Sequence, residues 1–117
     1  MSLLLELKKG RGRTYFKVEK VWPDGEGVYE GELDWKRRRT GHGKMVWADG
    51  SRIYTGYWHK NKMCGEGVIW WAGTGTYYTG GWRRGLVHGH GRLVYGAWSG
   101  SAGDVYEGQF RYKIGLQ

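Results

Sequence analysis

A tyrosine followed two residues later by a glycine recurs four times along the chain. The four copies begin at Tyr29, Tyr54, Tyr78 and Tyr106, at spacings of 25, 24 and 28 residues. The first three copies are each followed by a Gly-x-Gly pair: Gly41/Gly43, Gly65/Gly67 and Gly89/Gly91. A repeat of this length indicates an array of similar units, each of which buries its apolar face against its neighbours.

The composition favours strands over helices. Glycine accounts for 23 of the 117 residues, and each glycine inside a helix costs about 1 kcal/mol relative to alanine. Aromatic residues make up 16% of the chain, which is far too many for a disordered protein. We therefore expect one all-β domain at most.

Each complete repeat predicts a β-hairpin. In the second and third repeats, two apolar segments flank a polar segment of six residues, 59–64 and 83–88. Two such segments separated by a short polar stretch are typical of a pair of antiparallel strands. We expect the six-residue segments to form the hairpin loops.

Turn residues separate the hairpins from one another. Asp49-Gly50 and Pro23-Asp24-Gly25 lie between apolar segments, and Asp-Gly is a strong signal for a tight turn. The third junction, residues 96–104, is longer and accounts for the 28-residue spacing. We expect it to form a loop that exposes Trp98.

Alternation along the strands predicts one face made of aromatic and glycine residues. Tyr54, Gly56 and Trp58 share this face, because side chains two residues apart lie on the same side of a strand. Glycine there leaves room for neighbouring rings to lie flat over bare backbone. We expect a partner-binding groove lined by Tyr29, Trp47, Tyr54, Trp58, Trp71, Tyr78, Trp82 and Tyr95. The opposite face is more polar but carries an apolar stripe of Val46, Val68, Trp70 and Val94.

Two repeats carry an almost complete common signature. The third runs Tyr78-Thr79-Gly80-Gly81-Trp82 and then His88-Gly89-His90-Gly91. The second runs Tyr54-Thr55-Gly56-Tyr57-Trp58 and then Gly65-Glu66-Gly67. These residues resemble MORN (membrane occupation and recognition nexus) repeats, and the resemblance covers roughly residues 22–115. It implies an elongated, twisted antiparallel sheet of successive hairpins, an open array rather than a closed barrel.

The resemblance also implies how the chain is divided. A single array spans residues 1–117, beginning with an N-terminal capping hairpin at 1–28. Three repeats follow at 29–53, 54–77 and 78–105, and a partial C-terminal repeat covers 106–117. MORN modules are described as interaction scaffolds, with proposed binding to anionic phospholipids and no catalytic activity of their own.

The charge is strongly basic and concentrates in the polar segments of the repeats. The net charge is +8 and the isoelectric point is near 9.7, which favours acidic partners without choosing among them. All hairpin loops of an array project from the same edge, so we expect a basic loop edge. It comprises Lys36, Arg37, Arg38, Arg39, Lys60, Lys62, Arg83 and Arg84. The alternative reading is a solvated surface that keeps an aromatic-rich protein soluble.

Catalytic and metal chemistry find little support. His88 and His90 form only a partial metal pair, whereas zinc needs three or four ligands. Cys64 cannot form an intramolecular disulfide, and no base is placed beside it as in a catalytic triad. The Gly-x-Gly pairs lack the further glycine and the helix of a dinucleotide site. We expect no enzyme activity, no metal and no cofactor.

Three hypotheses for function follow. The first is a scaffold that binds a peptide or a helix in the aromatic groove. The second is binding to anionic membrane surfaces through the basic loops, and the third is a structural or designed repeat protein without an evolved partner. Nucleic acid is less favoured, because the chain lacks a recognition signature, and a homodimer is compatible with an open aromatic face. The lone cysteine favours a cytoplasmic chain, peripheral at membranes in the second hypothesis.

Overall fold

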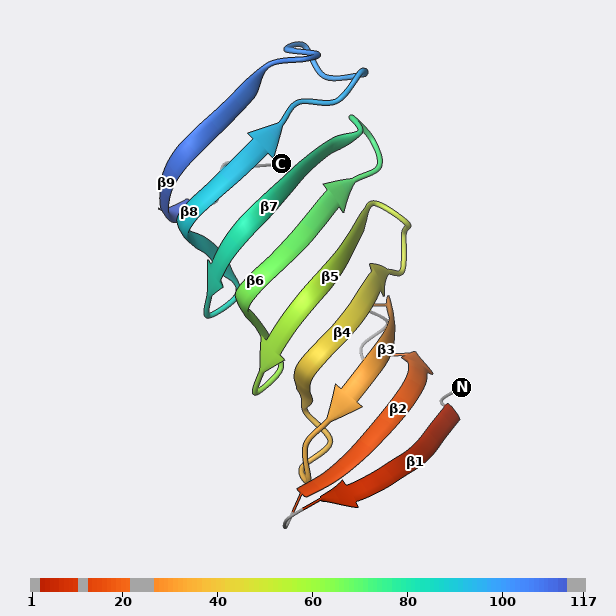
Figure 1. Cartoon of the computed structure of the whole chain (residues 1–117). Helices are drawn as coiled ribbons and strands as arrows, with labels where there is room; N and C mark the ends of the chain where they lie inside the picture. The colour runs from red at the N-terminus through yellow and green to blue at the C-terminus, as the bar shows by residue number, and fades with distance from the viewer. Residues whose placement is uncertain (1–2, 11–12, 22–26, 114–117) are drawn as a thin grey trace.

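The computed structural model describes residues 3–10, 13–21 and 27–113, with side chains for residues 27–111. These residues form one antiparallel sheet whose strands are ordered as in the sequence (Figure 1). The strands are β1 (Leu3–Gly10), β2 (Arg13–Val21), β3 (Gly27–Leu33), β4 (Arg39–Trp47), β5 (Arg52–His59), β6 (Lys62–Trp71), β7 (Thr76–Arg83), β8 (Leu86–Val94) and β9 (Val105–Lys113). The sheet is open, with β1 and β9 at its two sides. The predicted open, all-β array of hairpins is thus confirmed.

The two ends of the hairpins form two different edges of the molecule. The turns of β3–β4, β5–β6 and β7–β8 lie along one edge, and the junctions between hairpins lie along the other (Figure 1). We call them the hairpin-turn edge and the junction edge. At the junction edge, Gly50 N donates to Trp47 O (2.8 Å), as the Asp49-Gly50 signal predicts. Trp98 is exposed as expected, and the predicted Pro23-Asp24-Gly25 turn lies outside the described residues.

The prediction of six-residue hairpin loops is wrong, because the strands continue through most of each polar segment. Only Lys60-Asn61 and Arg84-Gly85 remain as turns, and all four residues have positive φ angles, 48°, 69°, 51° and 83°. This is the backbone of a type I′ turn, which matches the twist of the flanking strands. Each turn is also hydrogen-bonded to a strand of the preceding hairpin. Asn61 N donates to Arg39 O on β4 (3.1 Å), and Gly85 N donates to Met63 O on β6 (2.9 Å).

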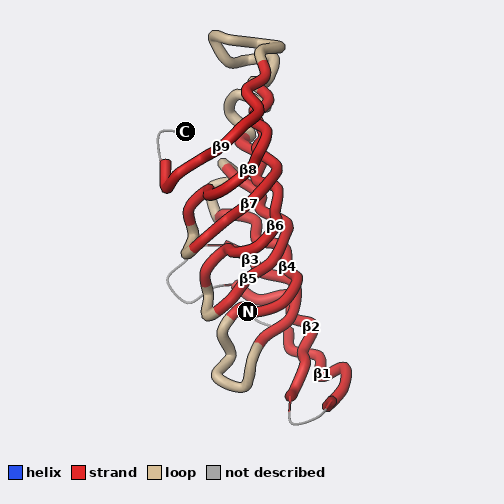
Figure 2. Tube along the Cα trace, turned by 60° about the vertical axis from the view of Figure 1, so that its left-hand side comes forward, coloured by secondary structure: helices blue, strands red, loops and turns tan. Residues whose placement is uncertain are grey.

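A bulge in each hairpin bends the strands. In the second repeat Gly56 pairs with Gly67 and Tyr57 pairs with Cys64, so β6 has two more residues than β5 at this point. Gly65, one of these two residues, has a φ of 63°, a left-handed value that favours glycine. Gly41 and Gly89 occupy the same place in the other repeats, with φ of 59° and 82°. Figure 2 shows the resulting curvature, since the traces of successive hairpins bend along a twisted sheet.

The core lies on the face that the sequence assigned to aromatic residues and glycine. Tyr29, Tyr54 and Tyr78 are fully buried there. A Cβ atom at Gly43, Gly67 or Gly91 would overlap the phenol ring of the tyrosine that covers it. Each phenol also donates to the carbonyl oxygen three residues further along, at Glu32 (2.9 Å), Tyr57 (3.0 Å) and Gly81 (2.9 Å). The second glycine of each Gly-x-Gly pair therefore provides the space in which the tyrosine ring lies.

Successive repeats are joined by an aromatic ladder. The rings follow one another in the order Tyr29, Trp58, Tyr54, Trp82, Tyr78, Phe110, Tyr106, with centroids between 4.8 and 5.6 Å apart and edge-to-face geometry. Such pairs contribute about 1 kcal/mol beyond the burial of their area. The indole nitrogens of Trp58 and Trp82 donate to the carbonyl oxygens of Gly43 (3.2 Å) and Gly67 (3.1 Å) in the preceding repeat. Each repeat thus fixes the position of the next.

Candidate functional site

The residues predicted to line a groove belong mostly to the core. Tyr29, Tyr54, Trp58, Tyr78 and Trp82 are buried members of the aromatic ladder. Tyr29, Tyr54, Tyr78 and Trp58 are closed off from a partner, so the structure places a core where we expected an accessible groove. Trp82 is also buried, but it lines a pocket at the hairpin-turn edge as well. Trp47, Trp71 and Tyr95 are partly buried and pack against that core nearer the junction edge. The sequence identified the correct face but could not show that the rings bury one another there.

Burial also keeps the core phenols uncharged. Desolvation raises the pKa of Tyr78 to about 12. The pKa values of Tyr29 and Tyr54 are raised further, again chiefly by burial, although the nearby Arg39 guanidinium partly offsets the effect on Tyr29. These hydroxyl groups act as hydrogen-bond donors to the backbone and offer no acid or base to a ligand.

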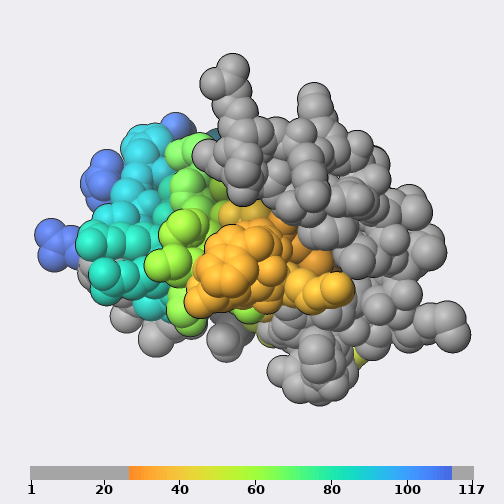
Figure 3. Space-filling view, turned by 90° about the horizontal axis from the view of Figure 1, so that it is seen from below, coloured from red at the N-terminus to blue at the C-terminus, as the bar shows by residue number. Residues whose placement is uncertain are grey.

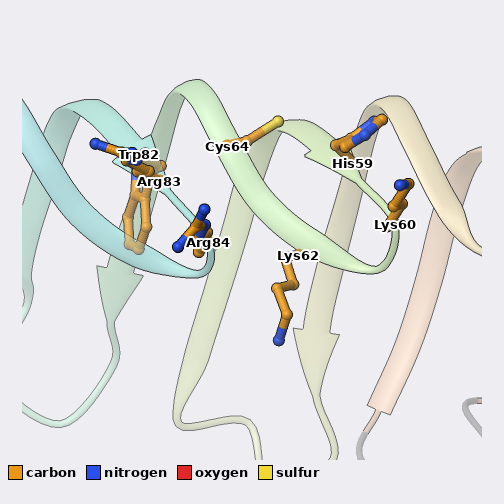
Figure 4. A pocket seen from close by; sticks show the side chains of 7 residues that line it. All are labelled: His59, Lys60, Lys62, Cys64, Trp82, Arg83 and Arg84. Carbon is orange, nitrogen blue, oxygen red and sulfur yellow. The ribbon is translucent and has the colours of Figure 1, made fainter.

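Half of the predicted basic residues gather around one pocket at the hairpin-turn edge. The pocket has a volume of about 500 Å³ and lies between the ends of the β5–β6 and β7–β8 hairpins (Figure 4). Its lining residues are His59, Lys60, Lys62, Cys64, Trp82, Arg83 and Arg84. In Figure 4, Cys64 on β6 lies between His59 and Lys60 on one side and Arg84 on the other.

The charge of this pocket is not compensated. Four of its lining residues are lysine or arginine, and none is aspartate or glutamate. Within the described part of the chain, none of these four basic side chains forms an ion pair. Several cations around one pocket without acidic partners produce a local positive potential that attracts anions. The arrangement therefore suits a phosphate or carboxylate group.

The turn of the first hairpin is built differently. Arg38 Nε donates to Asp34 Oδ2 (2.8 Å), and Asp34 Oδ1 accepts from the backbone nitrogens of Lys36 (2.8 Å) and Arg38 (2.9 Å). Burial pushes the pKa of Asp34 upward, but the hydrogen bonds from Arg38 and Lys36 outweigh it and keep the pKa below its usual value. Lys36 and Arg37 stay exposed at the edge, as predicted, beside Trp35.

Arg39 is an exception to the predicted basic edge, because its side chain is buried. It is only 6% exposed, and its guanidinium lies 4.5 Å from the ring centroid of Trp58. Its Nε donates to Asn61 Oδ1 (3.2 Å) and its Nη2 to Asn61 O (3.2 Å). Strand alternation could have predicted this burial, because Arg39 is an even number of residues from Gly41, Gly43 and Met45 and so shares the inner face with them.

Cys64 and His59 both line the basic pocket, but the Cys64 thiol is not activated as a nucleophile. Burial raises the pKa of the Cys64 thiol, which leaves little thiolate at neutral pH. Nowhere in residues 27–111 do three His, Cys, Asp or Glu side chains lie together as metal ligands would. His90 Nε2 lies 3.6 Å from Glu107 Oε2 on the exposed face of β8 and β9.

A helix long and apolar enough to span a bilayer is absent from the described residues.

Comparison with known proteins identifies the repeats. The family model of the MORN repeat matches residues 38–52, 54–76 and 78–100, which together make up more than half of the chain. No curated protein matches the sequence at a significant level. MORN repeats generally form scaffolds involved in membrane or protein interactions and are generally not enzymes. The matched segments contain Tyr54, Trp58, Tyr78 and Trp82 of the aromatic ladder, and the chain therefore belongs to the MORN repeat family.

Proposed function

We propose that the chain is a non-catalytic scaffold that binds anionic membrane surfaces through its hairpin-turn edge. The observation that carries this proposal is the cluster of four basic side chains around one pocket without an acidic counterpart. Lys36 and Arg37 extend the same edge. In the space-filling view from below, the orange, green and teal repeats lie side by side (Figure 3).

The expected strength of this binding is modest. A lysine or arginine close to an anionic leaflet contributes about 1 kcal/mol, and these contributions decrease as salt shortens the screening length. Six basic side chains on one edge are therefore enough for reversible, salt-dependent attachment. A pocket between two turns adds a place for one phosphate group to be contacted from several sides.

Sedimentation with vesicles tests the proposal. Vesicles of phosphatidylcholine containing phosphatidylserine or a phosphoinositide should carry the protein down at low salt and release it at about 0.5 M salt. Lys62→Gln and Arg83→Gln should each weaken binding by about fivefold. Both residues lie on strands, so their replacement leaves the type I′ turns intact.

The matched controls are Lys44→Gln and Arg92→Gln, which remove the same charge from exposed strand positions on the outer face. They should leave vesicle binding close to that of the wild type. If the wild type stays in the supernatant at low salt, or if the controls lose as much binding as the edge variants, the proposal is wrong.

A second candidate function, binding of a protein partner, is favoured by the outer face of the sheet. Its apolar residues lie in register across neighbouring strands and are partly or well exposed: Val28, Val46, Ile53, Trp70, Tyr77, Val94 and Val105. A continuous apolar row of this kind commonly marks an interface. If a second copy covers it, the wild type should sediment as a dimer and Trp70→Glu as a monomer. Monomers in both cases would exclude self-association through this row.

A further inference from the structure

The tryptophan near the turn of the first repeat lies outside the core, whereas its counterparts in the second and third repeats are buried in it. In the second and third repeats the tryptophan four residues after the tyrosine, Trp58 or Trp82, is part of the aromatic ladder. Leu33 occupies this position in the first repeat and is buried. Trp35 lies two residues further along, in the turn, and is 75% exposed. Its ring therefore makes no contribution to the core.

The turn that carries this ring is held rigidly. Asp34 accepts three hydrogen bonds, two from backbone nitrogens and one from Arg38 Nε. The backbone adds two more, from Arg37 N to Asp34 O (2.8 Å) and from Asp34 N to Arg38 O (2.9 Å). The only carboxylate of the turn is thus directed at its own backbone and at Arg38. What the turn presents outward is an indole ring with two cations.

Lys36 lies beside the ring, and Arg37 is the next exposed cation of the turn. Lys36 Nζ is 4.8 Å from the ring centroid of Trp35, and Arg37 follows at the exposed tip with a φ of 61°. The turn also belongs to the same edge as the basic pocket, because Arg39 O accepts from Asn61 N in the next turn. An exposed aromatic ring, two adjacent cations and a basic pocket are therefore arranged along one side of the molecule.

This combination fits the interface of an anionic bilayer better than a dissolved anion. Tryptophan concentrates at the level of the lipid headgroups, where its ring meets the acyl chains and its N–H meets water. A single weak signal gives only marginal membrane binding, whereas an apolar anchor together with basic residues gives stable attachment. A free phosphate would use the cations but would gain nothing from an exposed indole ring.

We infer that Trp35 is an interfacial anchor, which inserts into the headgroup region of an anionic bilayer while Lys36, Arg37 and the pocket residues contact the phosphates. This inference rests on the proposed function and adds to it an orientation, with the hairpin-turn edge facing the membrane. The junction edge then points away from the bilayer and leaves the outer face free.

The chain contains a matched control for this anchor. Trp98 is 74% exposed, almost the same as Trp35, but it lies at the junction edge between Ala97 and Ser99. Its backbone nitrogen donates to Thr74 O (3.1 Å), and no basic residue adjoins it in the loop at 96–104. The two tryptophans thus differ in their edge and in their charged neighbours rather than in their exposure.

Fluorescence quenching by lipids with brominated acyl chains tests the inference. In phosphatidylcholine–phosphatidylserine vesicles, the wild type and Trp98→Ala should be quenched to a similar extent, and Trp35→Ala should lose most of the quenching. The partition coefficient of Trp35→Ala should fall by about tenfold, whereas that of Trp98→Ala should stay within about twofold of the wild type. Near-UV circular dichroism checks that both variants keep the folded aromatic ladder.

A soluble anion distinguishes the two possible sources of the phosphate, a lipid headgroup and a free phosphate compound in solution. Inositol hexakisphosphate should bind the wild type and Trp35→Ala equally, because the ring does not contribute to binding in solution. If Trp35→Ala partitions and quenches as the wild type does while Arg83→Gln still weakens vesicle binding, the anchor is excluded but the proposed function stands. If the wild type binds neither vesicles nor the soluble anion, both are excluded.

Discussion

Trp58 on the inner face and Trp35 at the hairpin-turn edge belong to neighbouring hairpins of the same sheet, yet their surroundings are opposite. Trp58 is 4% exposed, touches Tyr29 and Tyr54, and donates its indole N–H to Gly43. Trp35 is 75% exposed and lies beside Lys36. The chain thus uses one residue type to join repeats and also to present an aromatic ring to the surroundings.

The basic residues are likewise of two kinds, buried in the core or exposed at the hairpin-turn edge. Arg39 packs over Trp58 and is buried, whereas Arg84 lines the open pocket. What separates the two classes is the position of the residue relative to the bulge and the turn. Residues that follow the inner parity of the strand enter the core, and residues in the turn project from the edge. Residue type alone therefore does not distinguish structure from function in this array.

The largest expected difference between the two regions concerns stability. Trp58→Ala should lower the free energy of unfolding by about 4 kcal/mol, because it removes a buried ring and leaves a cavity between two tyrosines. Trp35→Ala should change it by no more than about 0.5 kcal/mol, since the ring is exposed. Urea denaturation followed by circular dichroism measures both values. Equal losses for the two variants would show that the turn, too, is part of the stabilising core.

A smaller effect is expected from filling the space under a tyrosine ring. Gly67→Ala places a Cβ atom where the Tyr54 phenol lies and should cost about 2 to 3 kcal/mol through overpacking. Gly73→Ala serves as the control, because no atom lies within 4 Å of the added Cβ at that junction-edge position. The midpoints of urea denaturation should separate the two variants clearly. A neutral Gly67→Ala would mean that the ring can move away from the glycine.

The smallest expected effect is confined to alkaline pH. The pKa of Tyr78 is raised from 10.0 to about 12, so the neutral phenol is favoured by the fold. The corresponding stability is complete below pH 10 and is lost as the pH rises towards 12. Phenolate absorbance and near-UV circular dichroism, followed together, should show the core tyrosines ionising as the aromatic signal disappears. Ionisation of all tyrosines near pH 10 with the ladder intact would contradict the buried arrangement.

Much of the fold was readable from the repeat itself. The Tyr-x-Gly and Gly-x-Gly spacings, read with strand alternation, predicted the hairpins, the inner face and the Asp49-Gly50 turn. The hairpin loops could not be delimited, because Lys60-Asn61 lies within a longer polar segment and the sequence does not mark where the strands end. Its length was decided by backbone bonds to neighbouring strands, as from Asn61 N to Arg39 O, which involve residues far apart in the sequence.

The candidate site, too, was only partly predictable from the sequence. Sequence spacing predicted that Lys60, Lys62, Arg83 and Arg84 would meet at one edge, because every hairpin of an array turns on the same side. It could not predict that Arg39 would be buried. That result depends on a ring and an asparagine supplied by the next repeat.

The sequence by itself determined the repeat, the pairing of tyrosine with glycine and the edge on which positive charge collects, because these follow from local periodicity. Only the tertiary structure decided which aromatic rings are core and which are free. The bulges at Gly41, Gly65 and Gly89 bend each hairpin, and this bending brings rings from adjacent repeats into contact. Burial of Trp58 is a consequence of that packing, which no single repeat contains, because its ring contacts Tyr29 and Arg39 of the preceding repeat.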